Sequence, residues 1–369
     1  MKNTFGSSIA LTLFGESHGA AVGAVLDGVA PGIPVDAAAV ERQLARRRPR
    51  GGAETARREA DRFEILSGVF NGRTTGTPLC IVIRNEEAHS EDYRYGLARP
   101  SHADFAAYCK YHGHEDYRGG GHFSGRVTAA LVAAGAILQG ALEGLGIRIG
   151  THVLRCGGVA DRAFGDDVAA DLAALAGAEF PVLDAAQGER MVARILEAKA
   201  ALDSVGGVTQ TAIAGLPAGL GEPWFDSVEG MLSHALFSLG GVKGVEFGLG
   251  FGLAERTAGT CNDELCVEGG QVRTRTNFNG GVNGGITNGM PVTFQCAVKP
   301  TPSIAREQRT VDFTKGTEAP IEIKGRHDPA IVRRIVPVID AVSALVVADL
   351  LALRYGTDVL AKGREALGE

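Results

Sequence analysis

The feature that most limits the fold is a run of sixteen residues, 127–142, that contains no charged side chain. Arg126 and Glu143 bound this run. A helix that crosses a bilayer needs about 20 apolar residues, so the run is too short to span one. We therefore expect a buried helix over 126–145, because a helix that is apolar on every side must be surrounded by other elements. Residues 328–353 predict a second long apolar helix.

Strand-like segments and polar helices accompany these two apolar helices. Residues 5–14 predict a strand that ends at GESHG, and 22–36 a second strand with a Pro/Gly turn. Asp36 can cap a helix that runs through Arg46, and Asn71-Gly72 marks a hairpin turn. Further strands or hairpins are expected over 63–85, 147–158, 206–217, 240–252 and 274–304, and further helices over 164–203 and 226–239. The sequence predicts an α+β fold of mixed or antiparallel sheets packed with helices, in a single domain over 1–369.

The charge of the chain argues against a general attraction to polyanions. Its formal net charge is −6 at pH 7, so no overall field draws it to nucleic acid or to an anionic membrane. The basic segment RRRPR, 46–50, lacks the interleaved aromatic residues of a nucleic-acid patch. Most of its arginines are expected on a solvated face, and some suit a phosphorylated or carboxylated small molecule. A non-catalytic protein that binds nucleic acid or another anion through RRRPR stays an alternative.

Cysteine spacing predicts no metal site. The six cysteines form no CxxC pair and have no histidine at zinc-finger spacing. They are typical of reduced, buried thiols in a cytosolic protein. The N-terminal sequence MKNTFGSSIA leads directly into strand-like sequence without a secretory signal pattern. We therefore expect a cytoplasmic protein without a metal ion.

The segment GESHG, residues 15–19, is open to three interpretations. It satisfies G-x-S-x-G, the nucleophile elbow of hydrolases, with Ser17 as the nucleophile. An elbow follows several strands, however, and here nothing precedes the motif to supply an oxyanion loop. The segment can instead be a structural turn in which Ser17 and His18 are hydrogen-bonded. In the third interpretation His18 is the functional side chain.

Three later segments also carry polar side chains that suit an anionic ligand. Residues 99–126 contain His102, His112, His114 and His122, together with a glycine triplet whose backbone can approach an anion. Zinc is the alternative ligand for His112 and His114, which are two residues apart, and we expect no metal site there. VKPTPSI, 298–304, offers hydrogen-bonding side chains after a strand. In KGRHDPA, 324–330, Asp328 is either a catalytic acid or a simple helix N-cap.

In combination these segments resemble the chorismate synthase family over nearly the whole chain. The resemblance rests on motifs in the family's order and spacing: GESHGAAVGAVLDGVAPG, RRRP, LSGVFNGRTTGTP, RPSHAD, KYHGHEDYRGGGHFSGR, VKGVEFG, NGGVNGGITNG, KPTPSI and GRHDP. It favours His18 over Ser17 as the functional side chain of GESHG, because the histidine of that motif is functional in the family.

The resemblance implies a carbon–oxygen lyase of the shikimate pathway. The family converts 5-enolpyruvylshikimate 3-phosphate to chorismate by anti-1,4-elimination of phosphate, and it requires reduced FMN although no net redox change occurs. A β-α-β sandwich and a homotetramer are also implied. The chain has no long insertion that would suggest a built-in NAD(P)H-dependent reductase, so an external flavin reductant is expected.

The matching motifs also imply residue roles. His18 would protonate the leaving phosphate, His102 would protonate or neutralise reduced flavin near N1, and Asp328 would relay a proton from N5; histidine suits such roles because its ordinary pKa is about 6.5. The expected substrate-binding residues are Ser17, Arg47, Arg50 and Arg126. The expected FMN contacts are His122, Phe123, Ser124, Gly240, Gly241, Gly284, Lys299, Pro300, Thr301, Pro302, Ser303 and Arg326.

The chain departs from the family's pattern after the glycine triplet. His122, Phe123 and Val127 stand where arginine, serine and glutamate are more common, so a positive charge at position 122 depends on pH. The loop after RRRP is one residue short, which makes Arg50 the nearest equivalent of a family arginine. Asp340 stands where glutamate is usual in the last helix.

Overall fold

The computed structural model describes residues 2–52, 54, 60–86, 94–323 and 328–367. Its two main sheets each contain five strands, and every neighbouring pair of strands is antiparallel. The first sheet has the order β1 (Thr4–Phe5), β2 (Ala10–Gly15), β3 (Ala21–Asp27), β7 (Leu79–Arg84), β4 (Phe63–Ser67). The second has the order β11 (Val242–Phe247), β16 (Val292–Val298), β10 (Gly207–Ala214), β8 (Arg148–Cys156), β9 (Val159–Ala160).

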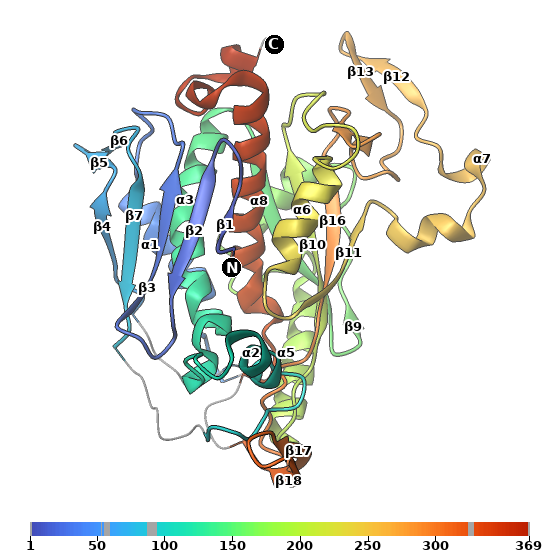
Figure 1. Cartoon of the computed structure of the whole chain (residues 1–369). Coiled ribbons are helices and arrows are strands. Elements are labelled where there is room, and N and C mark those ends of the chain that lie inside the picture. Colours follow the sequence, from blue (N-terminus) through green and yellow to red (C-terminus); the bar gives the residue numbers. More distant parts are fainter. Residues whose placement is uncertain (1, 53, 55–59, 87–93, 324–327, 368–369) are drawn as a thin grey trace.

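A helical layer separates the two sheets, as Figure 1 shows. It consists of α1 (Ala37–Arg47), α3 (Thr128–Gly144) and α8 (Val332–Tyr355). Helix α3 packs on β3 and β7, α8 packs on β8 and β10, and all three helices contact one another. The predicted α+β sandwich with helices between sheets is therefore confirmed.

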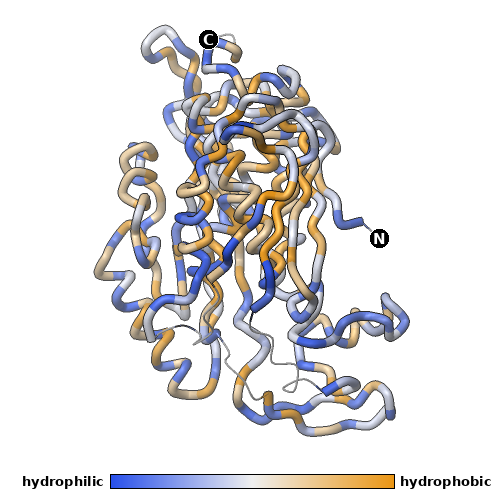
Figure 2. Tube along the Cα trace, turned by 90° about the vertical axis from the view of Figure 1, so that its left-hand side faces the viewer, coloured by the Kyte–Doolittle hydropathy of each residue, from blue (hydrophilic) through white to orange (hydrophobic). Residues whose placement is uncertain are grey.

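The helical layer supplies much of the apolar core. Figure 2 shows apolar residues running through the interior of the molecule. A Cβ atom at Gly135 would lie 2.4 Å from the Cβ of Ala341, so glycine allows α3 and α8 to approach closely. By length and composition the segments Gly125–Gly144 and Val332–Tyr355 could each cross a membrane, but 72% and 100% of their most apolar windows are buried inside the protein. Both are core helices.

Helix α8 also fixes the N-terminal segment. The Asp349 carboxylate is fully buried and accepts hydrogen bonds from the backbone N–H groups of Ser7, Ser8 and Ile9, at 2.9, 2.7 and 2.8 Å. These donors precede β2 and have no strand partner of their own. One side chain of the last long helix thus holds the start of the first sheet in place.

Most predicted elements are present, but several differ. The strand expected over 5–14 is two strands, β1 and β2, which pair with each other, and the strand expected over 240–252 ends at Phe247. Asp36 caps α1 through Ala38, and Asn71-Gly72 forms the turn between two short paired strands. The helix expected over 164–203 is two helices, α4 (Val168–Leu175) and α5 (Ala185–Ala200). Pro181 lies between them and has no N–H group to continue a helix. Helix α8 begins at Val332 after Ile331, so the alternative that Asp328 is its N-cap is wrong.

The remaining elements are shorter. They comprise α2 (Asp104–Tyr111), α6 (Val228–Phe237), α7 (Ala258–Cys261), β5 (Val69–Phe70), β6 (Arg73–Thr74), β12 (Leu265–Glu268), β13 (Gln271–Thr274), β14 (Val282–Asn283), β15 (Ile286–Thr287), β17 (Gln308–Asp312), β18 (Thr317–Ile321) and short 3₁₀ turns such as Arg118–Phe123 and Gly125–Val127. Helix α2 and the two 3₁₀ turns lie at the end of the sandwich away from the C terminus, in the lower part of Figure 1.

Candidate active site

A glycine loop lies against both candidate catalytic histidines. Gly119, Gly120 and Gly121 have φ angles of +62°, +94° and +53°, which side chains rarely adopt. A Cβ atom at Gly119 would lie 2.2 Å from Cε1 of His18, and one at Gly120 would lie 3.1 Å from Cε1 of His102. Two histidines that are far apart in the sequence therefore lie beside neighbouring glycines of one loop.

Ser17 is buried and supports His18. Its hydroxyl donates to the carbonyl of Arg118 at 3.2 Å and lies 3.1 Å from Nδ1 of His18. Because the hydroxyl proton is used on the carbonyl, Nδ1 of His18 is the donor to Ser17. GESHG joins β2 to β3 as a hairpin turn and does not enter a helix, so the strand–turn–helix context of a nucleophile elbow is absent from this segment. The hydrolase interpretation is wrong.

His102 is held by a carboxylate and an arginine. Its Nδ1 lies 2.6 Å from Oδ1 of Asp104, and the Arg99 guanidinium binds both oxygens of that carboxylate, at 2.7 and 2.8 Å. The backbone N–H of Arg99 donates to the same carboxylate at 2.8 Å. Burial raises the pKa of Asp104, but the hydrogen bonds from Arg99 and His102 outweigh it and hold this pKa well below its ordinary value.

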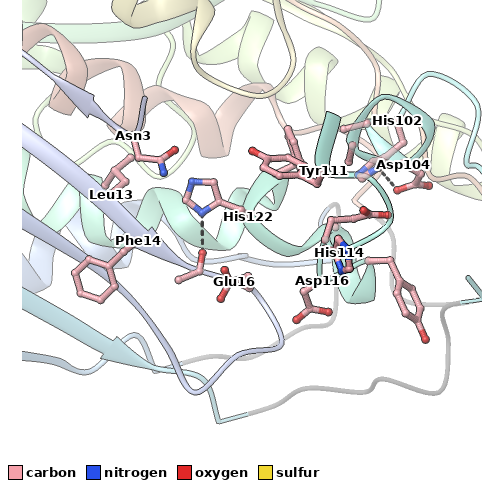
Figure 3. Close-up of a pocket in the computed structure, with 17 residues that line it drawn as sticks. Asn3, Leu13, Phe14, Glu16, His102, Asp104, Tyr111, His114, Asp116 and His122 are labelled. Atoms are coloured by element: carbon pink, nitrogen blue, oxygen red, sulfur yellow. Dashed lines mark hydrogen bonds and ion pairs between the residues drawn. The ribbon is translucent and has the colours of Figure 1, made fainter. Parts of the chain in front are cut away.

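A cavity of about 370 Å³ opens beside this histidine (Figure 3). His102 and His122 line it, together with aromatic side chains that include Phe14, Tyr111 and Phe123. Nδ1 of His122 donates to the carbonyl of Gly15 at 2.8 Å, which fixes its ring at the cavity wall. The volume is within the range of small-molecule sites, about 300–1,000 Å³.

Acidic side chains also line this cavity, so it is a poor place for a phosphate group. Glu16, Asp104, Glu115 and Asp116 all face it. Among the described residues that line the cavity, none is an arginine or a lysine. An uncharged aromatic ring suits this wall better than a phosphate or carboxylate does.

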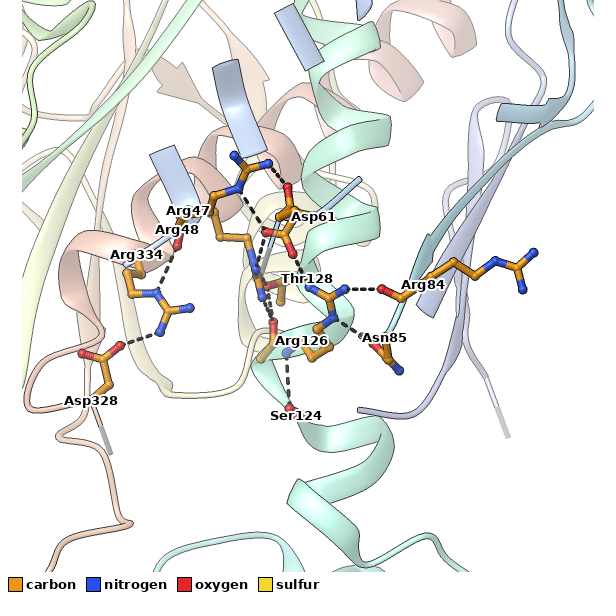
Figure 4. Close-up of polar contacts among 12 residues, drawn as sticks. Arg47, Arg48, Asp61, Arg84, Asn85, Ser124, Arg126, Thr128, Asp328 and Arg334 are labelled. Carbon is orange, nitrogen blue, oxygen red and sulfur yellow. Dashed lines mark hydrogen bonds and ion pairs between the residues drawn. The ribbon is translucent and has the colours of Figure 1, made fainter. Parts of the chain in front are cut away.

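The candidate anion-binding arginines form a second cluster, shown in Figure 4. Arg47 lies 3.3 Å from the buried carboxylate of Asp61, and Arg126 pairs with the other oxygen of that carboxylate. Arg47 also donates to the carbonyl of Gly125 at 2.6 Å, and Arg126 to the side chain of Asn85 at 2.9 Å. Asp61 thus neutralises part of a buried double positive charge.

Asp328 is connected to this cluster through α8. Arg334 donates to Oδ2 of Asp328 at 2.5 Å and to the carbonyl of Arg47 at 3.0 Å. Burial raises the pKa of Asp328 above its ordinary value, although Arg334 acts in the opposite direction. A buried carboxyl with a raised pKa can exchange a proton nearer to neutral pH than an exposed one.

The KPTPS segment approaches the histidine loops from the second sheet. The amino group of Lys299 donates to the carbonyl of Ser101, next to His102, and the Lys299 N–H donates to Gly241 at 2.9 Å. A Cβ atom at Gly240 would lie 3.9 Å from the carbonyl oxygen of Phe123. Residues from three segments that are distant in the sequence therefore meet at one place.

Comparison with known proteins agrees with this assembly. The family model for chorismate synthase matches residues 9–352. The chain is 46% identical over 354 residues to a chorismate synthase of Methanocella arvoryzae, covering 94% of this chain and 93% of that protein. It is 46% identical over 356 residues to one of Aeropyrum pernix, with 96% and 93% coverage. A solved crystal structure of a chorismate synthase superposes with a TM-score of 0.75 at 28% identity, covering 95% of this chain and 94% of that one.

This chain belongs to the chorismate synthase family. It is therefore an enzyme of the lyase class that acts on a small molecule. The sequence-based resemblance, which rested on motifs alone, is confirmed over nearly the full length of the chain.

The family implies a flavin, and two buried atoms fit such a ligand. The Thr301 hydroxyl and Oδ1 of Asp328 are buried and have no hydrogen-bond partner among the described residues. Both lie in segments that the resemblance assigns to the flavin site. Buried polar atoms are normally satisfied, so these two are ready to bond to a polar ligand. Open space around Gly240 also leaves room for close approach.

Several expected residues are not joined to this site by the described contacts. Gly284 lies in the β14–β15 turn, where a Cβ atom would meet nothing within 4 Å. Arg50 borders a small hollow with Arg46 and Arg333, near the start of α8. Arg326 lies outside the described residues. Ser124 is joined to the arginine cluster: its hydroxyl accepts from the N–H of Arg126 at 3.3 Å and caps the 3₁₀ turn that leads to α3.

Sequence reasoning assigned no role to four residues that organise the site: Arg99, Asp104, Asp61 and Arg334. Arg99 and Asp104 lie within RPSHAD, so their spacing around the histidine was a usable signal. No pattern marks Asp61 or Arg334, because Asp61 pairs with Arg126 across 65 residues and Arg334 bonds to the carbonyl of Arg47 across 287 residues.

Proposed function

We propose that this chain converts 5-enolpyruvylshikimate 3-phosphate to chorismate by anti-1,4-elimination of phosphate, with reduced FMN as the required cofactor. The observation that carries the proposal is the contact of one glycine loop with both His18 and His102, in a loop that continues into Arg126. Loss of a C–H proton and of phosphate needs two separate proton-transfer groups and an anion site. This loop contacts the two histidines and leads into Arg126 of the anion site.

The arginine cluster would hold the anionic groups of the substrate. In the ligand-free chain Arg47 and Arg126 share the carboxylate of Asp61. A substrate phosphate or carboxylate would therefore exchange with Asp61 for the guanidinium groups. Such bidentate pairs are among the stronger hydrogen bonds in proteins.

His18 is then the proton donor to the departing phosphate. With Nδ1–H donating to Ser17, the proton for phosphate would come from Nε2 of the doubly protonated imidazolium, which returns to the neutral ring. Charge on the leaving oxygen falls as the proton is transferred, which lowers the barrier to C–O cleavage.

His102, Asp328 and the KPTPS segment would serve the cofactor. When bound, reduced FMN supplies electron density to the allylic system as phosphate leaves. His102 would bond near N1, and the buried carboxyl of Asp328 would hold and pass on a proton near N5. Thr301, with its unpartnered hydroxyl, and Lys299 would hold polar groups of the cofactor, with Pro300, Pro302 and Ser303 shaping the same loop. The remaining proposed contacts are His122, Phe123, Ser124, Gly240, Gly241, Gly284 and Arg326.

We further propose a cytoplasmic homotetramer that receives reduced flavin from an external reductant, such as an NAD(P)H-dependent system. Six free cysteines support a reducing compartment. Side chains such as Trp224 and Phe225, exposed at 86% and 92%, support subunit contacts, because large exposed apolar groups often mark interfaces. Sedimentation analysis would give the assembly.

One anaerobic assay tests the reaction. The protein is mixed with 5-enolpyruvylshikimate 3-phosphate and chemically reduced FMN, and chorismate absorbance and free phosphate are followed together. We expect equal amounts of both products, and none with oxidised FMN. Phosphate without chorismate would indicate a phosphatase, and absence of both products would contradict the proposal.

A further inference from the structure

The hydrogen bonds of His102 determine which of its nitrogens carries the proton. Nδ1 lies 2.6 Å from Oδ1 of Asp104, and two lone pairs would repel each other at that distance. A proton must therefore lie between them. The pKa of Asp104 is held well below its ordinary value by Arg99, despite burial, so the carboxylate is ionised and the proton belongs to the histidine.

The arginine fixes the carboxylate itself. Arg99 uses two guanidinium nitrogens and its backbone N–H on Asp104, at 2.7, 2.8 and 2.8 Å. Nη2 of Arg99 also lies 3.0 Å from Nδ1 of His102. Nη2 of Arg99 and Nδ1–H of His102 are both donors, and both donate to Oδ1 of Asp104. They therefore do not hydrogen-bond to each other. The ring is thereby oriented from the Nδ1 side.

The opposite edge of the ring faces the glycine loop. A Cβ atom at Gly120 would lie 3.3 Å from Nε2 of His102, so the glycine keeps a side chain of this loop residue away from that nitrogen. His102 and Asp104 both line the 370 Å³ cavity. Nε2 is therefore the nitrogen on the side where a ligand can approach.

We propose that Asp104 is a positioning residue that keeps the proton of neutral His102 on Nδ1, so that Nε2 alone exchanges protons with the bound cofactor. The catalytic consequence of this inference rests on the proposed function, whereas the assignment of the His102 tautomer does not. Arg99 takes part by holding the carboxylate in place. A carboxylate that selects a histidine tautomer is a known device in catalytic triads, where its replacement by asparagine leaves the shape intact but the tautomer wrong.

The first test is spectroscopic and uses the protein without flavin. Long-range ¹H–¹⁵N spectra of protein labelled at histidine, at a pH about two units above 6.5, distinguish the tautomers. The His102 signals are identified by their loss in His102→Gln. We expect Nδ1–H in the native chain and Nε2–H in Asp104→Asn, because the asparagine amide can donate to Nδ1. Nε2–H in the native chain would overturn the inference, whether or not any variant folds.

The second test is kinetic. Asp104→Asn should lower kcat by about 10²- to 10⁴-fold, with little change in the KM for the substrate. If Asp104 acts through His102, the same substitution in a His102→Ala background should lower kcat no further. An equal loss in both backgrounds would show that Asp104 acts independently, and would overturn the positioning role.

The matched control is Asp171→Asn. Asp171 also accepts from an arginine fork, that of Arg162 at 2.6 and 3.0 Å, and from a backbone N–H, that of Gly165 at 2.8 Å. It is bonded to no histidine among the described residues, so this variant should keep full kcat. If the native protein is inactive with reduced FMN but carries Nδ1–H, the proposed function fails and the tautomer assignment stands. If it is active and Asp104→Asn keeps Nδ1–H, the inference fails alone.

Discussion

Gly119→Ala isolates the contact between the glycine loop and His18. The added Cβ would lie 2.2 Å from Cε1 of His18 and 2.7 Å from the Ser17 hydroxyl, whereas ordinary van der Waals contacts are 3.4 Å or more. The histidine ring would have to recede by about 1.2 Å, and a displacement of about 1 Å can lower a catalytic rate roughly 10²-fold. We therefore expect kcat to fall by about two orders of magnitude.

The cost in stability has two parts that a control can separate. Alanine at a φ of +62° costs about 1–2 kcal/mol, and the crowding adds about 1–3 kcal/mol. Gly316, in the β17–β18 turn, has a φ of +66° and no atom within 4 Å of an added Cβ. Gly316→Ala should therefore show the backbone cost alone, and should keep full activity.

The assays are urea denaturation for the free energy of unfolding and anaerobic turnover for kcat. The expected result is that Gly119→Ala loses about 1–3 kcal/mol more than Gly316→Ala and is far less active. Equal stability and equal turnover of the two variants would show that the loop does not press on His18, and the site geometry given above would be wrong.

The other substitutions test the proton donors, the N-terminal clamp and the buried acid. His18→Ala and His102→Ala should fold normally but lose about 10²- to 10⁴-fold in turnover; native rates in either would show that its role is misassigned. Asp349→Ala should lower the free energy of unfolding by about 3–6 kcal/mol, because three buried N–H groups lose their acceptor. Asp349→Asn keeps a side-chain oxygen and should lower it by less. Equal losses for the two variants in urea denaturation would contradict this. Burial raises the pKa of Asp328, so the native chain loses stability as pH rises through that pKa. The stability of Asp328→Asn relative to the native chain should therefore increase from pH 4 to pH 8. A decrease over this range would mean that folding lowers the pKa of Asp328.

The sequence predicted the layers of this fold better than its connections. An uncharged run has to be buried, so α3 and α8 were predictable from composition, and alternation and turn residues indicated the strands around them. The break between α4 and α5 was missed because alanine-rich sequence continues on both sides of Pro181. The single-domain boundary, 1–369, stays a prediction.

The site was predictable only where function lies in a local motif. His18 and His102 stand in GESHG and RPSHAD, and their proximity to one glycine loop follows from three-dimensional packing that no spacing rule encodes. Asp61 pairs with Arg126, and Arg334 bonds to the carbonyl of Arg47, across long stretches of sequence, so sequence patterns gave no signal for them. The motifs are visible in the local sequence, whereas long-range contacts determine how the motifs are placed relative to one another.

Two of the departures that the resemblance implies, at His122 and Phe123, line the cavity beside the glycine loop. His122 donates to the carbonyl of Gly15, a backbone group that any donor of suitable reach can satisfy. Phe123, at 44% exposure, faces the cavity through its ring and the second sheet through its carbonyl oxygen. Gly119 and Arg126, by contrast, touch His18 and Asp61, where a changed shape would move a proton donor and a changed charge would remove one of the arginines that pair with a buried carboxylate. Substitution at 122 and 123 therefore changes the contacts between the cavity wall and its ligand. The proposed proton donor His18 and the proposed anion-binding Arg126 keep their positions.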